Sequence, residues 1–207
     1  MTMQSAEEEM VQTPGRKIVQ CSAALTAIVS MPALAHPGLH HVAGFASGFA
    51  HPLAGWDHLL AMLAVGFWAS QQRRAMAIAL PVAFPLVMVL GALIATEGYA
   101  LPYAEVSVGG SVLVLGLLVA FAVKMPAWGG LPIIALFAAA HGYAHGLEIP
   151  GGSGLAAYAM GFVTATVMLH LAGLSVGPLV RTRSVGHAVR AFGAGIAAGG
   201  VYLLAVI

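Results

Sequence analysis

The stretch GFASGFAHPLAGWDHLLAMLAVGFWAS places His51, Asp57 and His58 in a run that is otherwise apolar enough to cross a bilayer. A carboxylate at mid-membrane costs about 2.5–3.5 kcal/mol on insertion scales, so ionisable residues there usually serve a function. Asp57 lies about 100° around a helix from His58. It can therefore ligate a metal ion between helices, or accept the second ring N–H of a histidine that ligates one.

The spacing of the two histidines in this stretch is compatible with two arrangements. In a straight helix, residues seven apart share a face and are separated by about 10 Å, which is too long for comfortable chelation of one ion. His51 and His58 then form two separate rungs. Alternatively, Pro52 and Gly55 bend the helix and draw the two rings together.

A second stretch, AAHGYAHGLEIP, carries His141, His145 and Glu148 at positions i, i+4 and i+7. All three project from one face of a helix, and the i, i+4 spacing lets two imidazoles grip one metal ion. Gly142 and Gly146 leave the neighbouring surface bare, so another helix or an ion can come close. We expect the two stretches to contribute to one metal site.

The other histidines suggest a path on either side of that site. His170 lies deeper in the membrane than the two stretches above, where it either makes an interhelical hydrogen bond or continues a file of imidazoles towards the cytoplasm. His36, His40 and His41 form an outer cluster, and a His36 at the mature N-terminus would offer both its α-amine and its imidazole to a metal. His187, beside an arginine, is predicted to lie at the membrane edge.

Composition identifies the class of protein. Of 207 residues, 60% are hydrophobic and 7% are charged, against roughly 25% charged in soluble domains. The chain is therefore expected to be a membrane protein, and its net charge of +1 gives no indication of nucleic-acid binding. Cys21 is the single cysteine, so metal chemistry must use nitrogen and oxygen ligands.

The first 35 residues resemble a secretory leader. Arg16 and Lys17 precede an apolar run that ends in a small-residue Ala-Leu-Ala site. We expect a cleavable signal peptide over 1–35 and a mature domain over 36–207. An uncleaved first membrane helix is the alternative, although Pro32 near the end of the run favours cleavage.

The mature chain contains apolar segments long enough to cross a ~30 Å hydrocarbon core. We predict an all-α membrane protein with six transmembrane helices, at about 43–70, 75–96, 105–123, 130–148, 154–177 and 186–207. Basic residues border these segments on one side: Arg73, Arg74, Lys124, Arg181, Arg183 and Arg190. Acidic residues lie on the other side: Glu97, Glu105 and Glu148. The positive-inside rule then places the protein in the inner membrane with its mature N-terminus in the periplasm.

Small residues and prolines indicate how the helices pack. Gly-x-x-x-Gly patterns begin at Gly44 and at Gly195, and such patterns allow two helices to approach closely. Pro81 and Pro85 each remove a backbone donor, so they are expected to bend the second segment.

HPLAGWDHLLAMLAVGFWA together with HGYAHGLE, set in six segments behind a leader, resembles the HupE/UreJ family of hydrogenase and urease accessory proteins. The first motif is also similar to the His-x4-Asp-His signature of nickel/cobalt transporters, with one more residue before the aspartate. The resemblance implies a non-enzymatic nickel permease, with cobalt or another divalent ion as the alternative cargo, and hydrogenase or urease maturation proteins as partners. It maps the functional residues onto His36, His51, Asp57, His58, His141, His145 and Glu148.

Other function classes are compatible with parts of the sequence. Imidazole suits nickel, copper, zinc and iron, but a site without cysteine argues against copper(I). A membrane factor that binds the metal without transporting it fits the same residues, and paired histidines can also ligate haem. The GGSG sequence at Ser153 weakly suggests an intramembrane hydrolase. Because no ATPase motif is present, transport would be secondary or channel-like.

Overall fold

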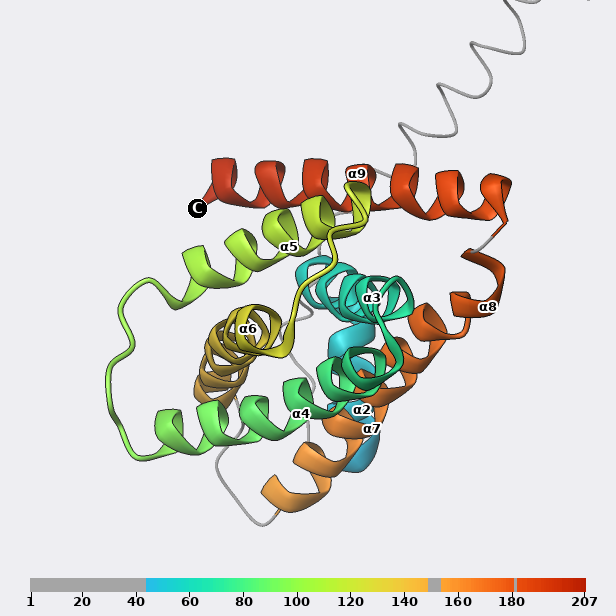
Figure 1. The fold of residues 1–207 in the computed structure, drawn as a ribbon. Helices are drawn as coiled ribbons and strands as arrows, with labels where there is room; N and C mark the ends of the chain where they lie inside the picture. Colours follow the sequence, from blue (N-terminus) through green and yellow to red (C-terminus); the bar gives the residue numbers. More distant parts are fainter. Residues whose placement is uncertain (1–43, 149–153, 181) are drawn as a thin grey trace, which may run out of the picture. The chain divides into compact units, whose positions relative to one another are not determined.

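The computed structural model describes residues 44–148, 154–180 and 182–207, and the regular structure in these ranges is entirely helical. The helices, labelled as in Figure 1, are α2 (Phe45–Ala54), α3 (Trp56–Ser70), α4 (Arg74–Thr96), α5 (Ala104–Ala120), α6 (Ala127–Glu148), α7 (Leu155–Leu174), α8 (Gly177–Val180) and α9 (Arg183–Val206). The predicted all-α class is confirmed for this part of the chain. The predicted signal peptide at 1–35 lies outside the described residues.

Within the described ranges, four helical stretches are long and apolar enough to cross a membrane: α4, α6 as far as Leu147, α7 with α8, and α9. They coincide with four of the six predicted segments, and the chain is a membrane protein. The segment predicted at 105–123 forms α5, which is apolar but has 17 residues and a length of about 25 Å. The segment predicted at 43–70 is divided into α2 and α3. The full count of six spans therefore stays a prediction.

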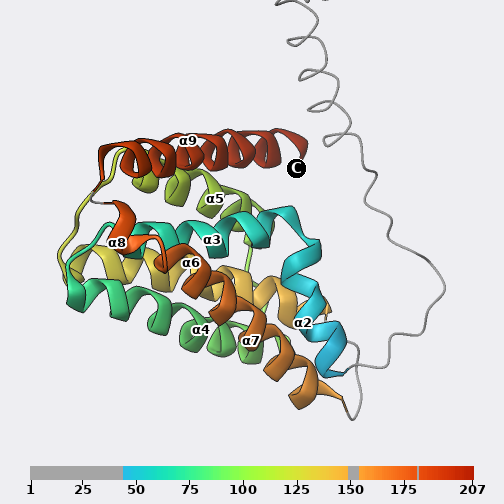
Figure 2. The ribbon, with the colours of Figure 1, turned by 90° about the vertical axis from the view of Figure 1, so that its right-hand side faces the viewer.

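The division between α2 and α3 lies at Gly55. This residue is extended (φ −87°, ψ 119°), so α2 ends at Ala54 and α3 begins at Trp56. Pro52 lies inside α2 and has no N–H to continue the hydrogen-bond ladder. Asp57 lies in the first turn of α3, where its negative charge is stabilised by the helix dipole. As a result, α2 runs in a different direction from α3 (Figure 2).

The helices pack in pairs, α4 on α6, α5 on α9, and both α2 and α3 on α7. A side-chain carbon at Gly48 would collide with the backbone of Tyr158, which confirms the close contact predicted from the first glycine pattern. The second pattern makes a looser contact, because an added carbon at Gly199 would meet only the end of the Leu60 side chain, at 3.1 Å. Gly195 has nothing within 4 Å, whereas Gly193 and Gly200 lie against the backbone or side chains of α5. Residues two apart point about 200° away from each other on a helix, so Gly195 faces away from that contact.

The connections next to the basic residues gather at one end of the bundle. Trp68 donates its indole N–H to the carbonyl oxygen of Val123 (2.8 Å), and the Gln72 amide donates to the same oxygen (2.8 Å). Arg190 of α9 donates to the carbonyl oxygen of Ala120 (2.8 Å). These bonds join the α3–α4 connection, the α5–α6 connection and the start of α9, as expected if the basic residues share one side of a membrane.

Candidate metal centre

The break at Gly55 brings His51 and His58 together. Their ring centroids are 6.2 Å apart in an edge-to-face arrangement, well short of the ~10 Å separation in a straight helix. The bent arrangement is thus confirmed over the two separate rungs. His58 is buried and His51 is half-buried.

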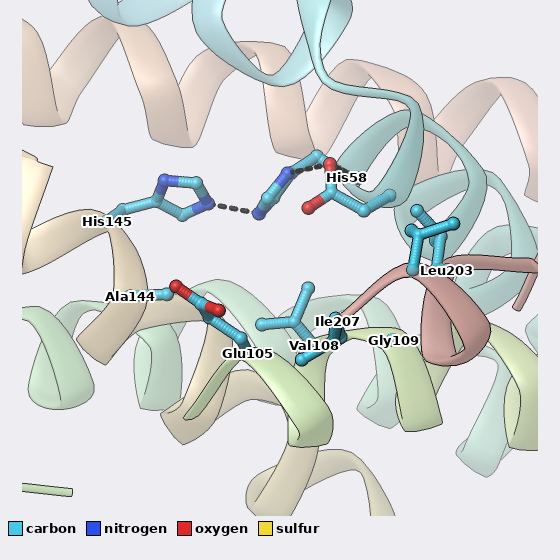
Figure 3. A pocket seen from close by; sticks show the side chains of 10 residues that line it. His58, Glu105, Val108, Gly109, Ala144, His145, Leu203 and Ile207 are labelled. Atoms are coloured by element: carbon cyan, nitrogen blue, oxygen red, sulfur yellow. Dashed lines mark hydrogen bonds and ion pairs between the residues drawn. The ribbon is translucent and has the colours of Figure 1, made fainter. Parts of the chain in front are cut away.

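Helix α6 adds two more imidazoles to this pair. His141 and His145 are both buried, and their ring centroids lie 5.0 Å and 4.0 Å from that of His58. The His51 ring lies 4.7 Å from that of His145, and the Nε2 atoms of His58 and His145 are hydrogen-bonded (Figure 3). His51, His58, His141 and His145 therefore form one histidine cluster, to which α2, α3 and α6 all contribute.

Oxygen acceptors fix the orientation of two rings in the cluster. The Nδ1 atom of His58 lies 2.6 Å from Oδ1 of Asp57, which also accepts the backbone N–H of His58 (2.8 Å). The Nδ1 atom of His141 lies 2.9 Å from the carbonyl oxygen of Phe137. A carbonyl or ionised carboxylate oxygen accepts only, so Nδ1 carries the proton and a neutral ring keeps its lone pair on Nε2. Histidines that ligate metals are usually oriented in this way.

The structure thus favours one of the two roles considered for Asp57, that of accepting the second ring N–H of a histidine.

His141 also has a ring nitrogen that is available to a ligand. Its Nε2 atom is buried and has no hydrogen-bond partner among the described residues, which is uncommon for a buried polar atom.

Aromatic side chains enclose the histidine cluster. Phe162 of α7 lies 5.7 Å from the ring of His51 and 4.6 Å from that of His145. Phe84 of α4 packs edge-on against His141 with the ring centroids 5.7 Å apart. These apolar rings exclude water from the side of the cluster that faces α4 and α7, which strengthens the interaction of the imidazoles with a charge on that side.

The imidazoles pack against one another instead of surrounding a common point. Within the ranges that the structure describes, no group of three or more His, Cys, Asp or Glu side chains is placed to hold one metal ion. Binding an ion here requires the hydrogen bond between His58 and His145 to open, so that their lone pairs can turn towards the metal.

A pocket of about 270 Å³ opens beside the cluster, with Asp57, His58 and His145 in its wall. Glu105, in the first turn of α5, also lines this pocket (Figure 3). A second hollow of about 440 Å³ shares Glu105 and Ala144 with the first. The glutamate thus adds a carboxylate to the approach to the histidine cluster.

Sequence reasoning assigned Glu105 only a topological role. The available signal was an acidic residue at the start of an apolar segment, on the same side as Glu148. The packing of α5 against α6 cannot be predicted from the sequence. This packing brings the Glu105 carboxylate into the same pocket wall as His145.

Two predicted histidines do not join the cluster. His170 is buried on α7 and contacts Phe84, while His187 is exposed on α9. Glu148 is the last residue of α6, three positions after His145. Four candidates lie outside the part of the chain that the structure describes: His36, His40, His41 and Ser153.

Comparison with known proteins agrees with these features. A family model described as "HupE / UreJ protein" matches residues 23–203. The chain is 41% identical over 181 residues to "Protein HupE" of Rhizobium leguminosarum bv. viciae, an alignment that covers 86% of this chain and 94% of that protein. No solved structure matches the chain. The resemblance noted in the sequence is therefore confirmed, and the chain belongs to the HupE/UreJ family.

Proposed function

We propose that this protein is a permease that imports nickel, or alternatively cobalt or another divalent metal ion, for hydrogenase or urease maturation. The observation that carries the proposal is the histidine cluster, four imidazoles brought together from three helices of an apolar bundle. The residues proposed to bind the metal or orient its ligands are His51, Asp57, His58, His141 and His145. The resemblance of the chain to the HupE/UreJ family implies nickel, and its membership of that family supports the choice of metal.

The chemistry of the cluster suits a borderline divalent ion. Imidazole nitrogens bind nickel, copper, zinc and iron, and the described site has no thiolate that would favour a softer ion. Asp57 and Glu105 add negative charge to the pocket, which offsets part of the cost of bringing a dication out of water.

The absence of a preformed cage within the described ranges is compatible with transport. An ion that must pass through needs sites that bind it strongly enough to enter and weakly enough to leave. Imidazoles that exchange a hydrogen bond with each other for a bond to the metal meet this requirement. The membrane potential supplies a driving force, because a dication moving inwards gains about 4.6 kcal/mol per 100 mV.

Uptake into proteoliposomes separates this proposal from a metal-binding assembly factor. With an imposed inside-negative potential of about 100 mV, the purified protein should accumulate nickel up to ~10³-fold. An assembly factor would bind nickel and accumulate none. A haem protein is disfavoured because His141 and His145 share one face of α6 and two carboxylates line the adjoining pocket, which suits a hydrated cation better; a haem absorbance band would reverse that conclusion.

The proposed direction of transport depends on topology. The predicted six spans place both the mature N-terminus and Ile207 in the periplasm, with the basic connections in the cytoplasm. Alkaline phosphatase fused after Ile207 should therefore be active, because the enzyme requires the periplasm. A fluorescent reporter that works only in the cytoplasm should be silent at the same position, and the opposite pattern would rule out this topology.

Asp57→Asn tests whether the carboxylate orients His58. The substitution keeps the shape of the side chain but removes its charge, so we expect nickel affinity to fall by about 10- to 100-fold. Isothermal titration of the purified protein measures this change. Glu97→Gln is the matched control, since Glu97 is an exposed carboxylate that does not line the pocket. Equal nickel affinity for Asp57→Asn and Glu97→Gln would show that Asp57 does not contribute to nickel binding.

A further inference from the structure

One buried face of α7 continues beyond the histidine cluster. Tyr158, Phe162, Thr166 and His170 follow one another at four-residue intervals, and all four are buried. The first two pack against His51. The last two lie about 6 and 12 Å farther along the helix, towards the end of the bundle that carries the basic connections.

His170 is oriented in the same way as His141. Its Nδ1 atom lies 3.3 Å from the carbonyl oxygen of Pro81, so Nδ1 carries the proton and a neutral ring has its lone pair on Nε2. The Pro81 carbonyl is available because the residue one turn later is Pro85, which has no N–H to donate. The Nε2 atom of His170 is fully buried and has no hydrogen-bond partner among the described residues.

Thr166 presents a second buried polar atom without a partner in the described ranges, its Oγ1 hydroxyl. A threonine in a helix usually bonds the carbonyl one turn back. Thr164, which is exposed on the same helix, does so by donating to the carbonyl oxygen of Met160 (2.7 Å). The Thr166 hydroxyl is therefore available to bind a ligand inside the bundle.

The ring of Phe84 contacts both His141 and His170, at centroid distances of 5.7 and 5.3 Å. The Phe84 ring therefore bridges two histidines that each have an Nε2 atom without a partner in the described residues.

We propose that Thr166 and His170 form an inner binding station for a divalent transition-metal ion, which receives it from the histidine cluster when the Phe84 ring moves aside. An imidazole nitrogen and a hydroxyl oxygen are suitable ligands for nickel and similar ions. This inference rests on the proposed transport function and adds a second step to it. It also gives Pro81 and Pro85 a role besides the bend expected from the sequence, because together they orient His170.

Two variants test the inner station. Thr166→Val removes the hydroxyl at nearly constant volume, and His170→Leu removes the ring nitrogen. Both should leave nickel binding to the cluster unchanged in equilibrium dialysis, while initial uptake of radioactive nickel into proteoliposomes falls about tenfold or more. Thr164→Val is the matched control, because it removes an exposed hydroxyl two residues away, and it should transport as the wild type does.

Wild-type uptake rates in both Thr166→Val and His170→Leu would overturn the inner station while leaving the proposed permease intact. Loss of nickel binding together with uptake would overturn it too, because the two residues would then support the outer cluster. If the wild-type protein binds nickel but transports none, the proposed function itself fails and the inner station fails with it. Thr166→Val keeps the test informative if His170→Leu does not fold.

Discussion

We expect nickel uptake to fall to background when His58 or His145 is replaced by alanine. These two rings are the closest pair in the histidine cluster, with centroids 4.0 Å apart, and each substitution removes a ligand nitrogen outright. His58 and His145 are also the two histidines that line the pocket beside the cluster, so losing either leaves a single imidazole in its wall. The measurement is initial uptake of radioactive nickel, normalised to the amount of folded protein in the membrane.

His187→Ala is the control for this experiment, since His187 is exposed on α9 and should transport at nearly the wild-type rate. Losing a merely packed imidazole costs at most ~1–2 kcal/mol of helix association, so the cluster variants should still reach the membrane. Equal uptake in His58→Ala, His145→Ala and His187→Ala would show that the cluster is not the route of the ion.

Gly142→Leu should destabilise the bundle strongly. A side-chain carbon at Gly142 would collide with the backbone of Met88, which shows that α4 and α6 approach closely there. Larger side chains in a packed interior cost about 1–3 kcal/mol and occasionally more, and leucine at a backbone contact belongs at the upper end. Because α6 carries His141 and His145, any displacement of this helix also disperses the cluster.

Thermal stability in detergent, followed by size-exclusion chromatography, measures this effect. Gly195→Leu is the matched control, because Gly195 is exposed and has nothing within 4 Å of an added side-chain carbon. We expect Gly195→Leu to behave like the wild type and Gly142→Leu to aggregate or unfold at a lower temperature. Similar melting of the two variants would mean that the α4–α6 contact is not tight.

The sequence predicts those parts of the fold and site that depend on local spacing. The apolar segments locate the long helices, and the i, i+4 positions of His141 and His145 place both rings on one face of α6. The bare surface at Gly142 and Gly146 was expected to admit a helix or an ion. The structure shows that the helix α4 occupies it.

The parts that depend on packing between distant helices could not be predicted. Pro52 and Gly55 permit a bend, but whether the chain bends is decided by the contacts that α2 and α3 each make with α7. Likewise, Glu105 reaches the pocket only because α5 packs beside α6. A glycine pattern alone does not say which face of a helix is buried, and the backbone contacts of α9 with α5 are made at Gly193 and Gly200 instead of Gly195.

Nickel K-edge X-ray absorption of the purified protein, loaded with nickel at one ion per chain, tests most directly whether the histidine cluster holds the metal. Bound imidazoles give a distinctive scattering pattern beyond the nearest ligand atoms. The spectrum should show nickel bound by more than one histidine, and this signal should decrease in His145→Ala but not in His187→Ala. Nickel surrounded by oxygen ligands alone, with the same spectrum in both variants, would contradict binding at the cluster.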